Sequence, residues 1–185
     1  MRKFIKNHKT IITIIVTIIT VTLLVFTPFS GTQRVSGGEG PAGWVKLKST
    51  ELPFSACFPN TPTLKEQTQP VPNSDKTLTF HEYSNDSYSL VYVDLPKSWI
   101  NWGSTIVFKG TLQQVLEHEK GTLVQKQKVQ HDSFPALEYE IKRNGDTILG
   151  RFILVNNTVY KLEMTSKEKS PEAAETFFNT FHVQT

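Results

Sequence analysis

The sequence contains very little cysteine and none of the short motifs on which most catalytic sites are built. Its only cysteine among 185 residues is Cys57, which excludes an intramolecular disulfide and any cysteine-rich zinc site. It has no Gly-x-Ser-x-Gly elbow, no glycine-rich phosphate loop and no Ser-His-Asp order. The five histidines are scattered and form no His-x-x-x-His pair. We therefore expect no metal, no cofactor and no enzymatic activity.

Cys57 itself lies in FSACFP (54–59), a short apolar stretch that reads as a strand. Alternation puts the two phenylalanines and the alanine on one face and Cys57 on the other. A nucleophilic cysteine needs a nearby base or a helix N-terminus to lower its pKa. No basic residue lies between Leu52 and Leu64, and His81 is only a candidate neighbour across the sheet. We expect a packed, inert thiol.

The main body of the chain also lacks a sizeable net charge of either sign. The whole sequence carries +3, but residues 1–43 hold five basic residues and one acidic residue. Residues 44–185 hold 15 basic and 16 acidic residues. A nucleic-acid-binding domain concentrates its basic excess on the folded body, so the distribution excludes nucleic acid as a partner.

Residues 11–29 form the one long run without a charge, and four basic residues precede it. A helix of nineteen residues is roughly 28 Å long, close to the hydrocarbon thickness of about 30 Å. The pattern predicts a single-pass signal-anchor in the plasma (inner) membrane. The basic tip, 1–10, places the N-terminus in the cytoplasm and the rest of the chain outside. The alternative is a signal peptide that is cleaved to release a secreted form.

Residues 30–43 hold five of the ten glycines and predict a flexible linker. A Gly-rich coil of this length spans about 20 Å between its ends. The folded, extracytoplasmic domain is then 44–185.

Within that domain the pattern is mostly that of strands joined by tight turns. Asn85-Asp86, Asn144-Gly145 and Asn156-Asn157 are typical of hairpins, because Asn and Gly accept the positive φ of two-residue turns. At least three strands should form an antiparallel meander. The expected strands are 44–49, 54–59, 77–84, 88–95, 136–142, 147–155 and 158–164.

Two helices complete the expected fold. The first should cover 111–121, with Thr111 as its N-cap and Gly121 as its end. The second should follow Ser170, with Pro171 in its first turn. The fold class is α+β: a transmembrane helix, then a single domain with an antiparallel sheet and two main helices.

Four stretches in this order carry a family resemblance: FSACFPNTP (54–62), YSLVYVDLP (88–96), VYKLEM (159–164) and FFNTFHV (177–183). They resemble the PsbP-like α/β/α sandwich superfamily, and the likeness covers about 44–183. That superfamily includes the extrinsic photosystem subunit, a yeast accessory protein for a nuclear-transport GTPase, and bacterial envelope proteins of the DcrB type. The resemblance implies a non-enzymatic accessory role and offers no catalytic residues.

The candidate partner-binding residues are Trp99 and Trp102, in LPKSWINWGSTIVF (95–108). This segment reads as a connection beside a central strand, and tryptophan is enriched at interface hot spots. The alternative is that the rings plug the seam between sheet and helix. We expect one buried and one partly exposed indole, with Trp102 the more exposed.

The leading hypothesis is a membrane-anchored, extracytoplasmic interaction or assembly domain whose partner is another envelope protein. A second hypothesis is binding of a small ligand or lipid between sheet and helices, which requires a cavity of a few hundred Å³. The third, a hydrolase, requires a base within hydrogen-bond reach of Cys57 or of a serine.

The predicted topology has a direct test. A protease added to intact spheroplasts should digest 44–185, because the domain lies outside, while a tag before residue 10 stays protected until lysis. The domain should also sediment with membranes. A domain that is cut only after lysis contradicts the orientation, and a soluble form without the first 30 residues contradicts the anchor.

Overall fold

The computed structural model describes residues 40–49, 52–71, 74–168 and 170–183. The predicted span (11–29) and the tip before it lie outside these residues, as does most of the linker. Among the described residues, no helix has the length and apolar character needed to cross a membrane.

Strands dominate the described residues, with three helices between them. The strands are β1 (Val45–Lys48), β2 (Phe54–Phe58), β3 (Thr63–Pro70), β4 (Thr77–Ser84), β5 (Tyr88–Asp94), β6 (Thr122–His131), β7 (Phe134–Arg143), β8 (Asp146–Val155), β9 (Thr158–Ser166) and β10 (His182–Val183). The helices are α2 (Lys97–Ile100), α3 (Ser104–Glu119) and α4 (Pro171–Asn179).

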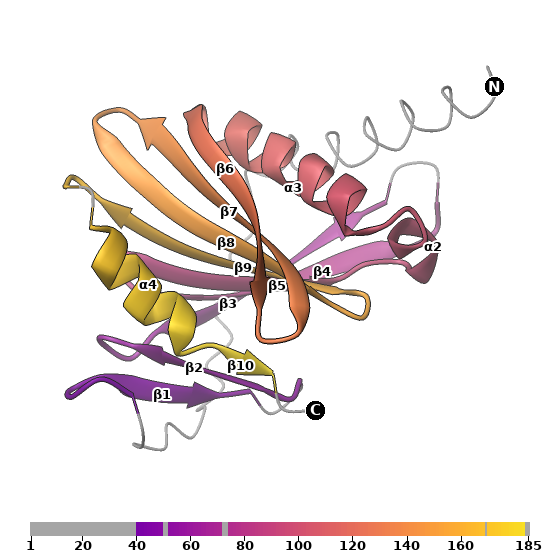
Figure 1. The fold of residues 1–185 in the computed structure, drawn as a ribbon. Coiled ribbons are helices and arrows are strands. Elements are labelled where there is room, and N and C mark those ends of the chain that lie inside the picture. Colours follow the sequence, from indigo (N-terminus) through magenta and orange to yellow (C-terminus); the bar gives the residue numbers. More distant parts are fainter. Residues whose placement is uncertain (1–39, 50–51, 72–73, 169, 184–185) are drawn as a thin grey trace.

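Two antiparallel sheets form, where a single sheet was expected. The large sheet has the order β3-β4-β5-β9-β8-β7-β6, and the small sheet has the order β1-β2-β10 (Figure 1). The expected meander is present as β7-β8-β9. Its hairpins turn through Asn144 and Gly145 (φ 50° and 92°) and through Asn156 (φ 54°), the positive φ values that such turns require. β5 pairs with β4 and β9, which confirms it as an inner strand.

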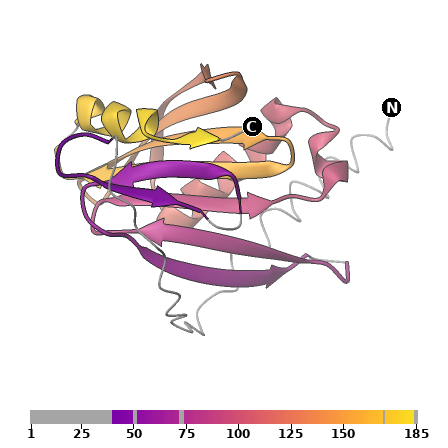
Figure 2. The same cartoon turned by 90° about the horizontal axis from the view of Figure 1, so that it is seen from below.

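Both faces of the large sheet are covered, which makes three layers (Figures 1 and 2). α4 and the small sheet cover one face, and the residues between them form what we term the first core. α2 and α3 cover the other face over the second core. Along β8, Ile153 contributes to the first core while Phe152 and Leu154 contribute to the second. A strand packed on both faces explains why TILGRFILV (147–155) is apolar almost without alternation.

The first long helix begins earlier than the sequence predicted. α3 starts after Gly103 (φ 85°), and Thr111 lies within it, where its hydroxyl donates to the carbonyl of Val107 at 2.9 Å. The segment 95–108, expected as a connection, is therefore α2 and the first turn of α3. The capping pattern at Thr111 misled the prediction. TIVF (105–108) is β-branched and aromatic, and burial of Val107 and Phe108 in the second core overrides its weak preference for a helix. The helix ends as expected next to Gly121, with Lys120 in the left-handed region.

The strands β3 and β6 were missed because they lie at the two edges of the large sheet. Each pairs on one side only, with β4 and β7 respectively. Most of their side chains are exposed, so the alternation of apolar residues that marks a half-buried strand is weak. α4, by contrast, follows Ser170 and begins at Pro171 as predicted.

Gly150 of β8 is required by the packing of the second core. It pairs with Tyr139 of β7, and a Cβ at Gly150 would lie 2.2 Å from the Cζ atom of that tyrosine. The ring crosses β8 over the glycine, and its hydroxyl donates to the Glu163 carboxylate of β9 at 2.6 Å. The Lys161 ammonium, 2.5 Å from the same carboxylate, balances its charge. Burial and the adjacent carboxylate raise the pKa of Tyr139 well above its usual value, so the phenol stays protonated.

Gly150→Ala should therefore destabilise the domain by about 1–3 kcal/mol, the usual cost of overpacking a filled core. Chemical denaturation of wild type and variant measures the difference in free energy of unfolding. In a Tyr139→Leu background the same change should cost clearly less, because the atoms that meet the new methyl group are gone. Equal costs in both backgrounds would contradict this account of Gly150.

Candidate functional site

The end of β5 is fixed to the turn between β8 and β9. The Leu95 N–H donates to the Asn157 carbonyl at 2.8 Å, and the Asn157 amide donates back to the Leu95 carbonyl at 3.2 Å. The Thr158 hydroxyl donates to the Asp94 carboxylate. Asp94 thus serves as a local clamp at the end of the strand, and the chain that follows leaves the sheet from an anchored point.

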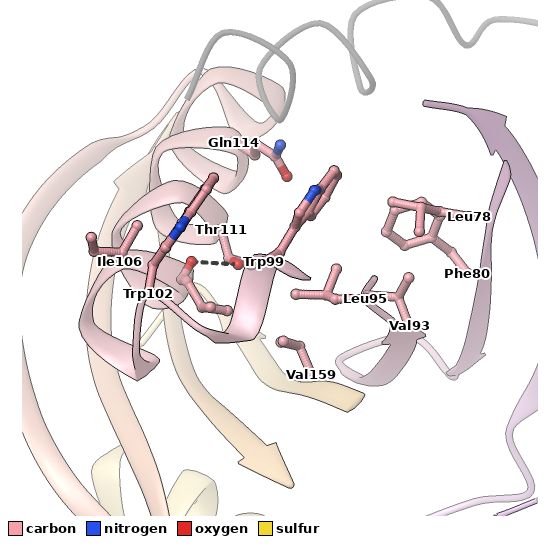
Figure 3. Close-up of a pocket in the computed structure, with 11 residues that line it drawn as sticks. Leu78, Phe80, Val93, Leu95, Trp99, Trp102, Ile106, Thr111, Gln114 and Val159 are labelled. Atoms are coloured by element: carbon pink, nitrogen blue, oxygen red, sulfur yellow. Dashed lines mark hydrogen bonds between the residues drawn. The ribbon is translucent and has the colours of Figure 1, made fainter. Parts of the chain in front are cut away.

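The two tryptophans are presented from either side of the tight turn between α2 and α3. The Trp99 N–H donates to the Pro96 carbonyl at 2.8 Å, and the Gly103 N–H donates to the Ile100 carbonyl at 2.8 Å. These bonds close one turn of helix and then reverse the chain into α3. As a result, Trp99 lies on α2 and Trp102 lies just before α3 (Figure 3).

Between these helices and the sheet lies a small hollow, which we call the tryptophan groove. Its cavity volume is about 50 Å³. Figure 3 shows the two indoles pointing the same way, with Thr111 between them. The groove is lined by Leu78, Phe80, Val93, Leu95, Trp99, Trp102, Ile106, Val107, Thr111, Gln114 and Val159.

Both tryptophans are partly buried, whereas we expected one buried and one partly exposed. Trp99 packs against the second core. Trp99 thus helps to fill the seam between sheet and helix, and both rings line an open hollow. Partner binding by the two tryptophans stays a prediction.

The groove can bind by apolar contact and has no groups for acid–base chemistry. Its polar lining residues are Thr111 and Gln114, and the Thr111 hydroxyl is engaged by Val107. A volume of about 50 Å³ is well below the roughly 300–1,000 Å³ of pockets that enclose a small molecule. It suits one apolar side chain of a partner.

A second hollow lies on the opposite face of the large sheet and was not anticipated from the sequence. Its cavity volume is about 230 Å³, and its walls come from β6, β7, β8 and α4. The polar side chains there include Gln125, Gln127, Glu138 and Glu175. The Gln125 amide donates to Glu140, another wall residue, at 3.0 Å. No motif marks this hollow, because its walls come together only when β6, β7 and α4 pack.

Cys57 is buried, and its surroundings are those of a packing residue. Its backbone N–H donates to the Thr180 hydroxyl at 2.9 Å. Gly40 packs against its side chain so closely that a Cβ there would lie 2.6 Å from the sulfur. Burial raises the pKa of the thiol, which disfavours the reactive thiolate. His81, the candidate base, instead stacks on Tyr92 with 4.5 Å between the ring centroids. Its Nδ1 lies 3.1 Å from a carboxylate oxygen of Glu66.

In the part of the chain that the structure describes, no three His, Cys, Asp or Glu side chains converge as metal ligands.

No protein-family model and no curated protein matches the sequence. Among solved structures, the chain is similar to the solution structure of cyanobacterial PsbP (CyanoP) from Synechocystis sp. PCC 6803. The sequence identity is 14% and the TM-score is 0.49, and the match covers 80% of this chain and 97% of that one. A likeness of this degree says nothing about what the chain binds.

Cys57→Ala should cost at most about 1–2 kcal/mol of stability, chiefly through the small cavity left by the sulfur. Any biological activity should survive wherever the variant folds. Loss of function with an unchanged melting temperature would instead reveal a reactive thiol.

Proposed function

We propose that this chain is a membrane-tethered, extracytoplasmic binding module without catalytic activity. In this proposal the tryptophan groove holds an apolar side chain of a partner protein in the cell envelope. We also place the chain with the bacterial envelope members of the superfamily that its sequence resembles. The charge-free run at 11–29, with its basic tip, supports the tether.

The observation that carries the proposal is the position of the groove relative to the tether. The first described residues belong to the side of the first core: Gly40 packs on Cys57, and Trp44 meets Tyr88 edge-on at 5.7 Å between ring centroids. The groove opens beside the second core, across the large sheet. A chain tethered through residue 40 therefore carries the groove on the face opposite its attachment, where the start of the domain does not cover it and a protein partner can reach it.

The chemistry of the groove supports an apolar ligand group. Aromatic and aliphatic side chains form most of its wall, and indoles are frequent anchors of binding energy at protein interfaces. α2 and the hydrogen-bonded end of β5 hold the rings in place before binding, which lowers the entropic cost of association.

The second candidate function is binding of a small polar molecule in the hollow beside α4. Its volume of about 230 Å³ is closer to the volume of a typical ligand pocket than the volume of the tryptophan groove is. We rank it second because two carboxylates of its wall, Glu138 and Glu175, already form ion pairs with Arg151.

The proposed function is tested by replacing Trp102, which lines the groove and is only partly buried. Trp102→Ala should reduce cross-linked partner recovered from membranes at least about tenfold, because the truncated residue no longer forms the groove wall. Its stability cost should stay at or below about 1–2 kcal/mol, because the ring is only partly buried. A photo-crosslinking residue at the exposed Asn101, present in both wild type and variant, identifies the partner, and calorimetry checks the fold.

The matched control is Lys48→Ala, an exposed change on β1 of the small sheet. It should leave capture unchanged. Equal capture by wild type and Trp102→Ala would contradict the groove as the binding site. Loss of capture in both Trp102→Ala and Lys48→Ala would show that the contact is not confined to the groove.

A further inference from the structure

A single buried arginine joins three elements on the face of the large sheet that α4 covers. Arg151 of β8 is 6% exposed. Its guanidinium donates to Glu138 of β7 and to both carboxylate oxygens of Glu175 on α4, at 2.9 and 3.0 Å. It also lies 4.8 Å above the ring of Phe178, again on α4. Arg151 therefore holds the C-terminal helix onto the sheet.

The remaining contact of the guanidinium is to a buried histidine. Arg151 Nη1 lies 3.2 Å from Nδ1 of His131, the last residue of β6, which is also 6% exposed. On the other side of the ring, Nε2 lies 2.8 Å from the Phe181 carbonyl oxygen. These partners fix the tautomer. A guanidinium can only donate, so Nδ1 must accept; a carbonyl can only accept, so Nε2 must carry the proton.

The contact with Arg151 requires a neutral imidazole, because Nδ1 must carry a free lone pair to accept from the guanidinium. A second proton on Nδ1 would point at a donor N–H and bring two cations within 3.2 Å inside the protein. His131 can keep its bond to Phe181 when protonated but must lose its bond from Arg151.

The segment held in this way carries the cover of the first core. Phe181 precedes β10, whose two residues pair with Ser55 and Phe54 of β2. The Thr180 hydroxyl extends the same attachment to the Cys57 N–H. Figure 2 shows α4 leading into β10 beside the other two strands of the small sheet, β1 and β2. Through His131 and Arg151, the end of β6 therefore connects the large sheet to α4, β10 and the small sheet.

We propose that His131 and Arg151 form an acid-sensitive latch, in which proton uptake by His131 loosens α4 and β10 from the large sheet. The inference is independent of the tryptophan groove, which lies on the opposite face. It gives an extracytoplasmic domain a way to respond to the acidity of its surroundings.

The charged groups around His131 come from four elements. Burial lowers the pKa of His131 most, and Arg151 and His182 lower it further. The Phe181 carbonyl and Asp132 act in the opposite direction. Asp132 also faces His182 at 3.6 Å, so part of its charge is directed away. Glu138 and Glu175 reach the histidine only through Arg151.

The sign of the pH dependence follows. The pKa of His131 is lower in the folded chain than its usual value near 6.5. At pH values between these two pKa values, the unfolded or opened state therefore binds more protons than the folded state. The stabilisation is complete above about pH 6.5 and declines as the pH falls toward the lowered value. Acid therefore opens the latch.

Hydrogen exchange on the full-length chain in detergent tests this directly. Protection factors of 171–183 should fall at least about tenfold between pH 7.5 and pH 5.0, after correction for intrinsic exchange, while those of β8 and β9 change much less. His131→Gln should abolish the difference, because its amide donates and accepts in the same places but does not titrate. His118→Gln, an exposed histidine of α3 on the opposite face of the sheet, is the matched control and should keep the wild-type response.

An equal loss of protection in wild type and His131→Gln would overturn the latch, as would a wild-type segment that stays protected at pH 5.0. Should the glutamine variant not fold, imidazole NMR of the wild type decides. His131 is expected as the Nε2–H tautomer, titrating below 6.5 together with the exchange of 171–183; titration at or above the usual value is incompatible with the proposal.

Discussion

The fold depends on burying the large sheet on both faces. β8 has nine consecutive buried residues, and β9 is nearly as enclosed, so neither strand has a face that water can solvate. Each face requires its own cover: α4 with the small sheet on one, and α2 with α3 on the other. The tryptophan groove lies at the edge of the second cover, and the latch lies under the first. Both features follow from how the sheet is enclosed.

Buried polar groups fix how those covers sit. Apolar packing tolerates small shifts, whereas a buried charge must keep its partner. The Tyr139 hydroxyl and Lys161 satisfy Glu163 beneath α3. Arg151 links Glu138 and Glu175 beneath α4. The Arg151 network includes Glu175 of α4, so it penalises alternative packings of that helix. The Glu163 network joins β7 to β9 within the large sheet.

Much of the local structure followed from the sequence because local rules decide it. The Asn-Gly and Asn-Asn hairpins, the strand at 147–155 and the proline start of α4 depend mainly on neighbouring residues. The edge strands β3 and β6 and the true start of α3 did not follow. An edge strand whose two faces are both exposed to solvent shows no regular alternation of apolar residues. The first turn of α3 is helical only because the sheet buries Val107 and Phe108.

The sequence by itself determined the charge-free run before the domain, the near-neutral body, the absence of catalytic motifs and the two tryptophans worth following. These are properties of composition and spacing, which do not depend on how distant segments meet. Only the tertiary structure decided that Trp99 and Trp102 share one hollow, and that His131 stands between Arg151 and Phe181. The tautomer and the burial of that histidine come from residues 20 and 50 positions away, and such contacts exist only once the sheet and its covers have packed.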